Sequence, residues 1–283
     1  MSNAVRDLLA GAAARLAERA PEDARAEAEI LLAHCLGCDR TALWARPEAL
    51  VPADLAARCR ALVGRRAAGE PVAYLTGRRG FWTFELEVTP AVLVPRPETE
   101  LLVEQTLAAF PADAPVHLVD LGTGSGAIAL AIAAERPAWE VVATDASADA
   151  LAVARRNAAR LGLTAVSFRL GDWAQALHPN ERFAAIVSNP PYVADADPHL
   201  TEGDLPWEPR TALVAGADGL DAIRRLTAAA LPHLEPGGWL LLEHGADQGE
   251  AARGILARAG LVGVHTVRDL AGLERVSGGR SLD

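Results

Sequence analysis

The sequence predicts an α/β protein, in which a mostly parallel sheet is covered by helices and preceded by a small helical domain. Three observations carry this prediction. Apolar runs of strand length alternate with helical patterns from Pro95 onward, and residues 1–74 show helical periodicity alone. A glycine-rich turn at Gly122–Gly126 also joins a buried strand to a helix. The 283 residues suffice for one large domain or two modest ones.

Proline and glycine divide the first 74 residues into helical segments, which we place at about 4–19, 22–36 and 53–67. Residues 75–95 do not show this helical pattern. Gly80–Val88 is aromatic and alternating, and Thr89-Pro90 then turns into Val92–Val94, which predicts a β-hairpin. We therefore expect three parts. They are a helical substrate-recognition domain (1–74), a hairpin linker (75–95) and an α/β domain (96–283).

The composition excludes several classes of function. All 27 basic residues are arginine, so a P-loop lysine, a Schiff-base lysine and a lysine general base are excluded. The net charge of −10 argues against a large nonspecific nucleic-acid surface, which needs a basic face. The longest apolar run, 127–134, is too short for a membrane span and no signal peptide is evident, so we expect a cytoplasmic protein.

The cysteines do not indicate a metal or redox centre. Cys35 and Cys38 have C-x-x-C spacing at the end of a predicted helix, and Cys59 stands apart. A zinc or redox role for the pair needs a second ligand pair or a following βαβ unit, and neither is present. We expect reduced, structural cysteines and no metal.

The glycine-rich turn and the two strand ends after it predict a binding site. Gly122-Thr123-Gly124-Ser125-Gly126 allows a ligand close to the backbone, and its spacing differs from the GxGxxG that holds a pyrophosphate. The strand at 140–144 ends in Asp145, where a carboxylate can bind ribose hydroxyls. After the strand at 165–170, Asp172 and Trp173 can bracket an adenine, although Asp172 can equally be a turn residue.

Asn189-Pro190-Pro191-Tyr192 is the most informative motif of the chain. It follows the apolar run 183–188, at the edge of the sheet where open α/β proteins bind ligands. Because proline restricts the backbone, the Asn189 side-chain oxygen and the Pro190 carbonyl form two acceptors aimed at one point. A planar NH2 group has two hydrogens to give to such a pair. Taken alone, the motif is equally typical of a proline-rich turn.

Together these elements predict the S-adenosylmethionine site of a class I methyltransferase. A dinucleotide reductase is the alternative for the fold, but it leaves the Asn-Pro-Pro-Tyr motif without a purpose. The chain also resembles the release-factor glutamine methyltransferases, the HemK family, along nearly its full length. The segments that carry the resemblance are Val92–Glu100 with Gly80–Trp82 upstream, Asp120–Leu130, Ser188–Val193, Trp207–Leu213 with Gly219–Asp221, and Asp269–Val276.

The resemblance implies a helical N-terminal domain, a hairpin linker and a seven-stranded, Rossmann-like methyltransferase domain. It implies that Gly122, Thr123, Gly124, Ser125, Gly126, Asp145, Asp172, Trp173 and Asn189 contact the methyl donor. Asn189, Pro190, Pro191 and Tyr192 hold the substrate by the same resemblance. That substrate is the glutamine of the Gly-Gly-Gln loop of bacterial class 1 peptide chain release factors, methylated on its side-chain nitrogen. We expect a monomer.

The hypothesis for catalysis is in-line methyl transfer with Asn189 and Pro190 accepting the two amide hydrogens, while Tyr192 packs on the amide plane. The acidic segment 193–218 is either a solvated loop or a contact surface for the substrate. Two other substrates remain open, a ribosomal-protein glutamine and an exocyclic amine of a nucleic acid. The sister group reads Pro-Arg-Ser-Pro where this chain has Pro95-Arg96-Pro97-Glu98, which favours release factors. Glu98, Glu100 and Arg96 receive no role.

Overall fold

The computed structural model describes residues 3–19 and 21–282, which form two compact units. The first unit contains the residues up to Arg78 together with Thr201–Trp207. The second contains Arg79–Leu200 and the residues from Glu208 onward. A short internal segment of the chain therefore belongs with the N-terminal helices.

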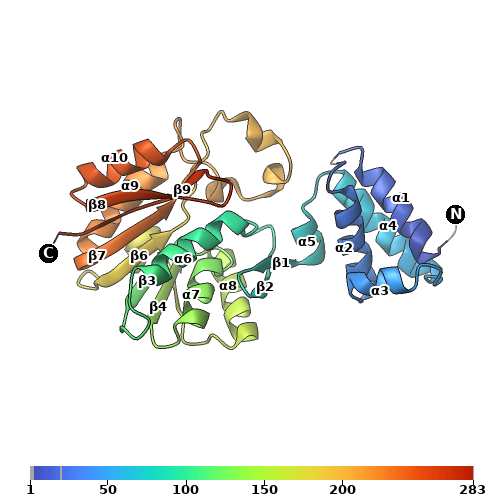
Figure 1. Ribbon diagram of the computed structural model, residues 1–283, viewed down its shortest axis with the longest axis horizontal. Coiled ribbons are helices and arrows are strands. Elements are labelled where there is room, and N and C mark those ends of the chain that lie inside the picture. Colours follow the sequence, from blue (N-terminus) through green and yellow to red (C-terminus); the bar gives the residue numbers. More distant parts are fainter. Residues whose placement is uncertain (1–2, 20, 283) are drawn as a thin grey trace. The chain divides into compact units, whose positions relative to one another are not determined.

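The first unit consists of helices packed around an apolar core (Figure 1). Leu8, Leu31 and Val63 contribute to this core from three different helices. Two short helices were not predicted, because five or six residues are too few to show a helical period. The helices are α1 (Val5–Leu16), α2 (Ala24–Leu36), α3 (Arg40–Ala45), α4 (Ala53–Ala67) and α5 (Val72–Thr76).

A buried arginine joins the internal segment to these helices. Arg66 is only 6% exposed and donates to both carboxylate oxygens of Glu27, at 2.8 and 2.7 Å. It also donates to Asp204 at 2.6 Å, and Arg19 donates to the Gly203 carbonyl at 2.7 Å. Removing either partner of a buried ion pair leaves an uncompensated charge, so Arg66 requires both carboxylates.

The hairpin is present, but its turn lies elsewhere than predicted. Strands β1 (Arg78–Phe81) and β2 (Phe84–Glu87) form a two-stranded sheet that turns at Trp82-Thr83, and Val92–Val94 belongs to no strand. Trp82 has a left-handed φ of 57°. Its backbone N–H donates to Glu100 and its indole N–H to Glu135, each at 2.8 Å. These distant carboxylates hold a turn that the local sequence does not indicate.

The second unit contains a seven-stranded sheet of order β5-β4-β3-β6-β7-β9-β8, which confirms the predicted fold class. The pairs from β5 to β7 are parallel, and β9 is antiparallel to both neighbours. Since the chain moves outward from β3 and then returns to β6 on its other side, the sheet has a switch point there. The strands are β3 (His117–Leu121), β4 (Glu140–Asp145), β5 (Ser167–Leu170), β6 (Phe183–Ser188), β7 (Leu234–Glu243), β8 (Val262–Arg268) and β9 (Glu274–Arg280).

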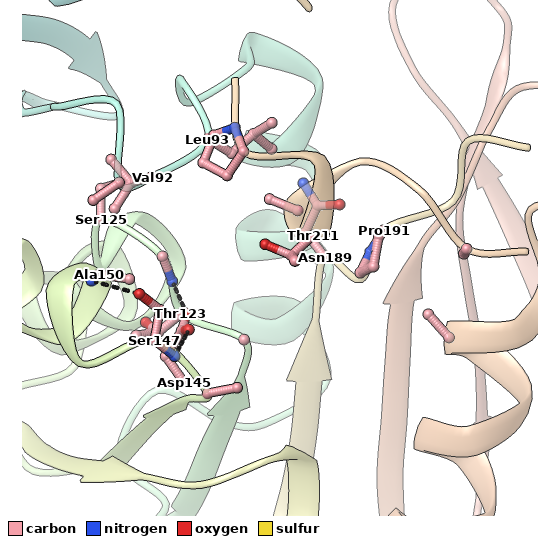
Figure 2. Close-up of a pocket in the computed structure, with 18 of the residues that line it drawn as sticks. Val92, Leu93, Thr123, Ser125, Asp145, Ser147, Ala150, Asn189, Pro191 and Thr211 are labelled. Carbon is pink, nitrogen blue, oxygen red and sulfur yellow. Dashed lines mark hydrogen bonds between the residues drawn. The ribbon is translucent and has the colours of Figure 1, made fainter. Parts of the chain in front are cut away.

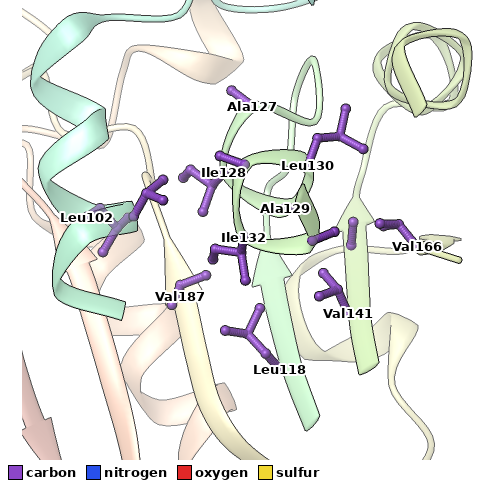
Figure 3. Packing of buried hydrophobic residues seen from close by; sticks show 14 of the residues in the cluster. Leu102, Leu118, Ala127, Ile128, Ala129, Leu130, Ile132, Val141, Val166 and Val187 are labelled. Atoms are coloured by element: carbon purple, nitrogen blue, oxygen red, sulfur yellow. The ribbon is translucent and has the colours of Figure 1, made fainter. Parts of the chain in front are cut away.

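Helices cover both faces of this sheet. Leu118 belongs to a core shared with α6 and α7, whereas its neighbour Val119 faces a second core shared with α9 and α10 (Figure 3 shows the first core). In residues 3–19 and 21–282, no helix has the length and apolar character needed to span a membrane. The covering helices are α6 (Glu100–Ala108), α7 (Ala127–Glu135), α8 (Ala148–Leu161), α9 (Asp221–Ala230) and α10 (Gly249–Arg258).

A fully buried asparagine on α8 fastens the hairpin to the rest of the second unit. The Asn157 amide nitrogen donates to the carbonyls of Glu87 (3.0 Å) and Ser125 (2.9 Å), and its oxygen accepts from the Glu87 N–H (2.6 Å). One side chain on α8 therefore satisfies backbone groups of β2 and of the glycine-rich turn.

Replacing this side chain should destabilise the second unit. Asn157→Ala leaves up to three buried polar groups without partners, so we expect a loss of about 2–4 kcal/mol in the free energy of unfolding. Urea denaturation measures this loss. The control is Asn180→Ala at an exposed position, which should change the stability by less than about 0.5 kcal/mol. Equal midpoints for the two variants would contradict the role of Asn157.

Candidate active site

A cavity of about 810 Å³ lies at the carboxyl ends of β3, β4 and β6. Figure 2 shows Thr123, Asp145 and Ser147 on one side of it, and Asn189, Pro191 and Thr211 on the other. The structure brings most of the predicted site residues to this cavity. Those that line it are Gly122, Thr123, Gly124, Ser125, Asp145, Asp172, Trp173, Asn189 and Pro191.

The glycine-rich turn is shaped by the end of the neighbouring strand. The Thr144 carbonyl of β4 accepts from the N–H groups of both Gly122 (2.9 Å) and Thr123 (2.8 Å). Gly122 and Gly124 have φ values of 81° and 55°, in the left-handed region that favours glycine. A Cβ atom at Gly122 would stand 3.5 Å from the Trp173 ring. The backbone of the turn is thus exposed to whatever fills the cavity.

Gly126, which the family resemblance implies as a donor contact, does not line the cavity in this structure. A Cβ atom there would lie 3.0 Å from a Leu130 methyl group and 3.3 Å from Ala154. Its φ of 87° also disfavours other residues. Gly126 therefore permits close packing between α7 and α8.

Asp145 binds the backbone on both sides of its own strand end. One carboxylate oxygen accepts from the Gly124 N–H and the other from the Ser147 N–H, each at 2.8 Å (Figure 2). Burial raises the pKa of this carboxyl group, and the hydrogen bonds from Ser147 and Gly124 oppose that rise. Each oxygen keeps a further lone pair for a hydroxyl group in the cavity.

The predicted acid and aromatic pair lies at the end of β5. Trp173 has a left-handed φ of 50°, which places its ring against Gly122. Asp172 pairs with Arg225 of α9 at 2.8 Å, and both side chains are largely exposed. The salt bridge orients Asp172 at the cavity wall, and its solvent exposure makes it worth little to stability.

Hydrogen bonds to residues of other elements hold the Asn-Pro-Pro-Tyr motif in place. The Ser188 hydroxyl donates to the Leu121 carbonyl at 2.5 Å, joining the ends of β6 and β3. The Asn189 amide nitrogen donates to the Thr99 hydroxyl at 3.1 Å. Pro190 is buried, and neither it nor Tyr192 lines the cavity. The Tyr192 hydroxyl instead donates to Glu243 at 3.3 Å, so the side chain points away from the position we expected for it.

Several polar residues around the cavity were not predicted. Glu208 is buried, accepts from the Val94 N–H at 2.9 Å and pairs with Arg96. Thr99 is 4% exposed and contacts Asn189 from η1 (Pro97–Thr99). Both residues lie in segments that carry the family resemblance, around Pro97 and Trp207, but no role was assigned to them from the sequence.

Asp120 lies buried beneath the glycine-rich turn. It accepts from the Thr123 hydroxyl at 2.6 Å, and its other oxygen has no partner among residues 3–19 and 21–282. Burial raises the pKa of this carboxyl group to about 7, the Thr123 hydroxyl lowers it, and the nearby Asp145 charge adds to the rise. Asp120 supports the turn without facing the cavity.

Two family models match the chain. The PrmC N-terminal domain matches residues 7–77, and the methyltransferase small domain matches residues 97–203. The chain is 56% identical over 256 residues to the release factor glutamine methyltransferase of Xylella fastidiosa strain 9a5c, covering 90% of this chain and 93% of the relative. The chain belongs to the release factor glutamine methyltransferase family.

Other family members give the same result. The release factor glutamine methyltransferase of Pseudomonas aeruginosa is 52% identical over 91% of this chain and 92% of its own. That of Escherichia coli K12 is 47% identical over 93% and 94%. The fold also matches a solved Pyrococcus furiosus methyltransferase with a TM-score of 0.53 at 19% identity, over 80% of this chain and all of that one. Membership of the family thus rests on sequence, and the solved structure supports the fold.

In this family member, Asp120 should make stability fall as pH rises. Its carboxyl group has a pKa of about 7 when folded and an ordinary value of 3.8 when exposed. Between these values the folded state binds more protons than the unfolded state, so the free energy of unfolding decreases with pH. Asp120→Asn should flatten this dependence in urea titrations from about pH 5 to pH 7. Exposed Asp113→Asn is the control, and an unchanged slope in Asp120→Asn would refute the assignment.

Proposed function

We propose that this protein transfers the methyl group of S-adenosylmethionine to the side-chain amide nitrogen (N5) of a release-factor glutamine, in the Gly-Gly-Gln motif. The family membership supports the reaction, and one observation of the site carries the mechanism. The Asn189 amide nitrogen is occupied by Thr99, while its oxygen accepts no hydrogen bond from the described residues. This leaves an acceptor at the cavity wall, which is what an incoming amide NH2 group requires.

The cavity fits the methyl donor. Its volume lies within the roughly 300–1,000 Å³ of small-molecule sites. The positive φ angles of Gly122 and Gly124 bring bare backbone to the cavity, Asp145 offers lone pairs to ribose hydroxyls, and Trp173 offers an aromatic face to adenine. Gly122–Ser125, Asp145, Asp172, Trp173 and Asn189 are the proposed donor contacts. When bound, the donor supplies an electrophilic methyl group on a sulfonium.

The Asn-Pro-Pro-Tyr motif orients the nucleophile. An amide nitrogen is weakly nucleophilic because its lone pair is delocalised into the carbonyl group. The Asn189 oxygen at the cavity wall accepts one of its hydrogens, which directs the lone pair and favours positive charge that develops during transfer. The second hydrogen is assigned to the carbonyl of Pro190, a buried residue between the cavity-lining Asn189 and Pro191. Alignment of two bound reactants can supply about 7–11 kcal/mol of the barrier. Pro191 lines the cavity beside them, and Tyr192 supports the motif from behind.

The protein substrate follows from the same proposal. We assign recognition of a bacterial class 1 release factor to the helical domain, which matches the PrmC N-terminal model. The charge of −10 fits a protein substrate better than a polyanion. The relatives at 47–56% identity are named for release factors, so a ribosomal protein or a nucleic acid is not retained as an alternative.

The direct test is methyl transfer from labelled S-adenosylmethionine to a purified release factor. We expect label in the wild-type factor and none when the glutamine of its Gly-Gly-Gln motif is changed to alanine. Mass spectrometry of the peptide then places the added methyl group. Equal labelling of both factors would contradict the proposed residue, and labelling of neither, with donor binding intact, would contradict the substrate.

Two variants should separate transfer from donor binding. Asn189→Ala removes the acceptor, so we expect kcat to fall by at least about 100-fold while donor affinity weakens much less. Asp145→Ala should instead weaken the donor affinity by about tenfold or more, because it removes both the ribose ligand and the acceptor of the Gly124 N–H. Calorimetry gives the affinities and a single-turnover assay the rates. Equal losses in both quantities for Asn189→Ala would make Asn189 a donor ligand only.

A further inference from the structure

The proposed reaction requires one of the two possible orientations of the Asn189 side-chain amide. An asparagine side chain can present either its oxygen or its NH2 group in the same place, since the two ends are nearly equal in size. Only the oxygen can accept a hydrogen from a substrate amide. The reversed side chain would direct hydrogens at hydrogens and repel the substrate.

Thr99 is the residue that contacts the other end of this amide. Its hydroxyl lies 3.1 Å from the Asn189 nitrogen and is almost completely buried. A hydroxyl both donates and accepts, so Thr99 by itself could pair with either end of the amide. Something else must determine the direction in which the single hydroxyl hydrogen points.

The carboxyl group of Glu243 can determine the direction of the Thr99 hydroxyl hydrogen. Glu243 ends β7, is 1% exposed, and the Thr99 and Tyr192 hydroxyls both lower its pKa. Tyr192 donates to one oxygen at 3.3 Å, and the other oxygen has no partner at ordinary hydrogen-bonding distance in the described part of the chain. An ionised carboxylate there attracts the Thr99 hydrogen and turns the lone pairs of Thr99 toward Asn189.

We propose that Thr99 and Glu243 are positioning residues, which hold the Asn189 amide with its oxygen toward the substrate. The Asn189 nitrogen contacts the Thr99 hydroxyl, and Tyr192 contacts Glu243. Glu243 also follows Leu242, which pairs with Ser188 of the neighbouring strand, so it lies beside Asn189 and its partner. Neither positioning residue touches the reacting atoms in this arrangement. The inference rests on the proposed role of Asn189 as the acceptor of the substrate amide.

The charge state of Glu243 gives the arrangement a pH dependence. Burial raises its pKa to about 7, while Thr99, Tyr192 and Arg275 lower it and Glu98 raises it. A protonated Glu243 can donate to Thr99, whose hydrogen is then free to bind the Asn189 oxygen and reverse the amide. The kcat of the enzyme should therefore rise with pH to a plateau above about 7.

The test compares two variants of Thr99 with a matched control. Thr99→Val keeps the shape and removes the hydroxyl, so we expect kcat to fall about 10- to 100-fold, with the donor affinity within about twofold of wild type. Thr99→Ser restores the hydroxyl and should recover most of the rate. The control is Thr106→Val in α6, the helix that follows Thr99, where a fully buried hydroxyl donates to the Leu102 carbonyl at 2.7 Å.

Glu243→Gln provides a second readout, because it removes the titrating group at nearly constant volume. We expect its kcat to lose the rise with pH that the wild type shows. Rates are measured on the full chain with wild-type release factor, and thermal unfolding verifies that each variant is folded. A rate for Thr99→Val equal to wild type, or a loss of equal size in Thr99→Ser or in Thr106→Val, would overturn the positioning role.

Asn189→Ala distinguishes this failure from that of the proposed function. If Asn189→Ala is inactive and Thr99→Val is fully active, the positioning role alone is wrong. If Asn189→Ala remains active, the amide is not the substrate acceptor, and both proposals are wrong. Loss of rate in Asn189→Ala and Thr99→Val, with recovery in Thr99→Ser, supports both.

Discussion

The shape of the cavity depends on hydrogen bonds between the end of β4 and the turn that follows β3. The Thr144 carbonyl accepts from two consecutive backbone N–H groups of the turn, and the next residue, Asp145, accepts from a third at Gly124. These hydrogen bonds require glycines with positive φ in the turn after β3 and a carboxylate at the end of β4, the strand paired with β3. Because the turn is fixed before any ligand arrives, the binding surface is largely pre-organised.

The sequence predicted those parts of the site in which adjacent residues act together. The turn after β3, Asp145 after β4 and Asn189 after β6 could be located because each directly follows a buried apolar strand. Such predictions use only strand order and the common edge of a parallel sheet. The sequence did not indicate the hydrogen bond of the Tyr192 hydroxyl, since its partner Glu243 comes from a strand 51 residues further along the chain.

The parts that were missed depend on partners distant in sequence. Trp82 adopts a left-handed turn because Glu100 and Glu135 bind its two N–H groups, and nothing within the hairpin itself indicates that turn. Thr99 reads locally as a helix-start residue, and its contact with Asn189 spans 90 positions. Buried polar groups must find partners, but a sequence does not say which ones.

Three buried acidic side chains lie near the cavity, and they differ in their hydrogen-bond partners. Glu208 has an arginine and a backbone amide, whereas Asp120 and Glu243 have hydroxyl partners and one oxygen each without a partner in the described ranges. Burial raises the pKa of Asp120 and that of Glu243 to about 7, so the protonation of these two acids responds to pH near neutrality.

The inclusion of Thr201–Trp207 in the helical unit has a consequence for biosynthesis. Arg66 and Asp204 are separated by 138 positions, and strands β3 to β6 of the seven-stranded sheet are translated between them. The N-terminal helices therefore leave the ribosome before the carboxylate that completes the pairing of their buried arginine exists. The ion pair between Arg66 and Asp204 can form only after that late segment has been translated, so the domain that is synthesised first receives one of its buried contacts last.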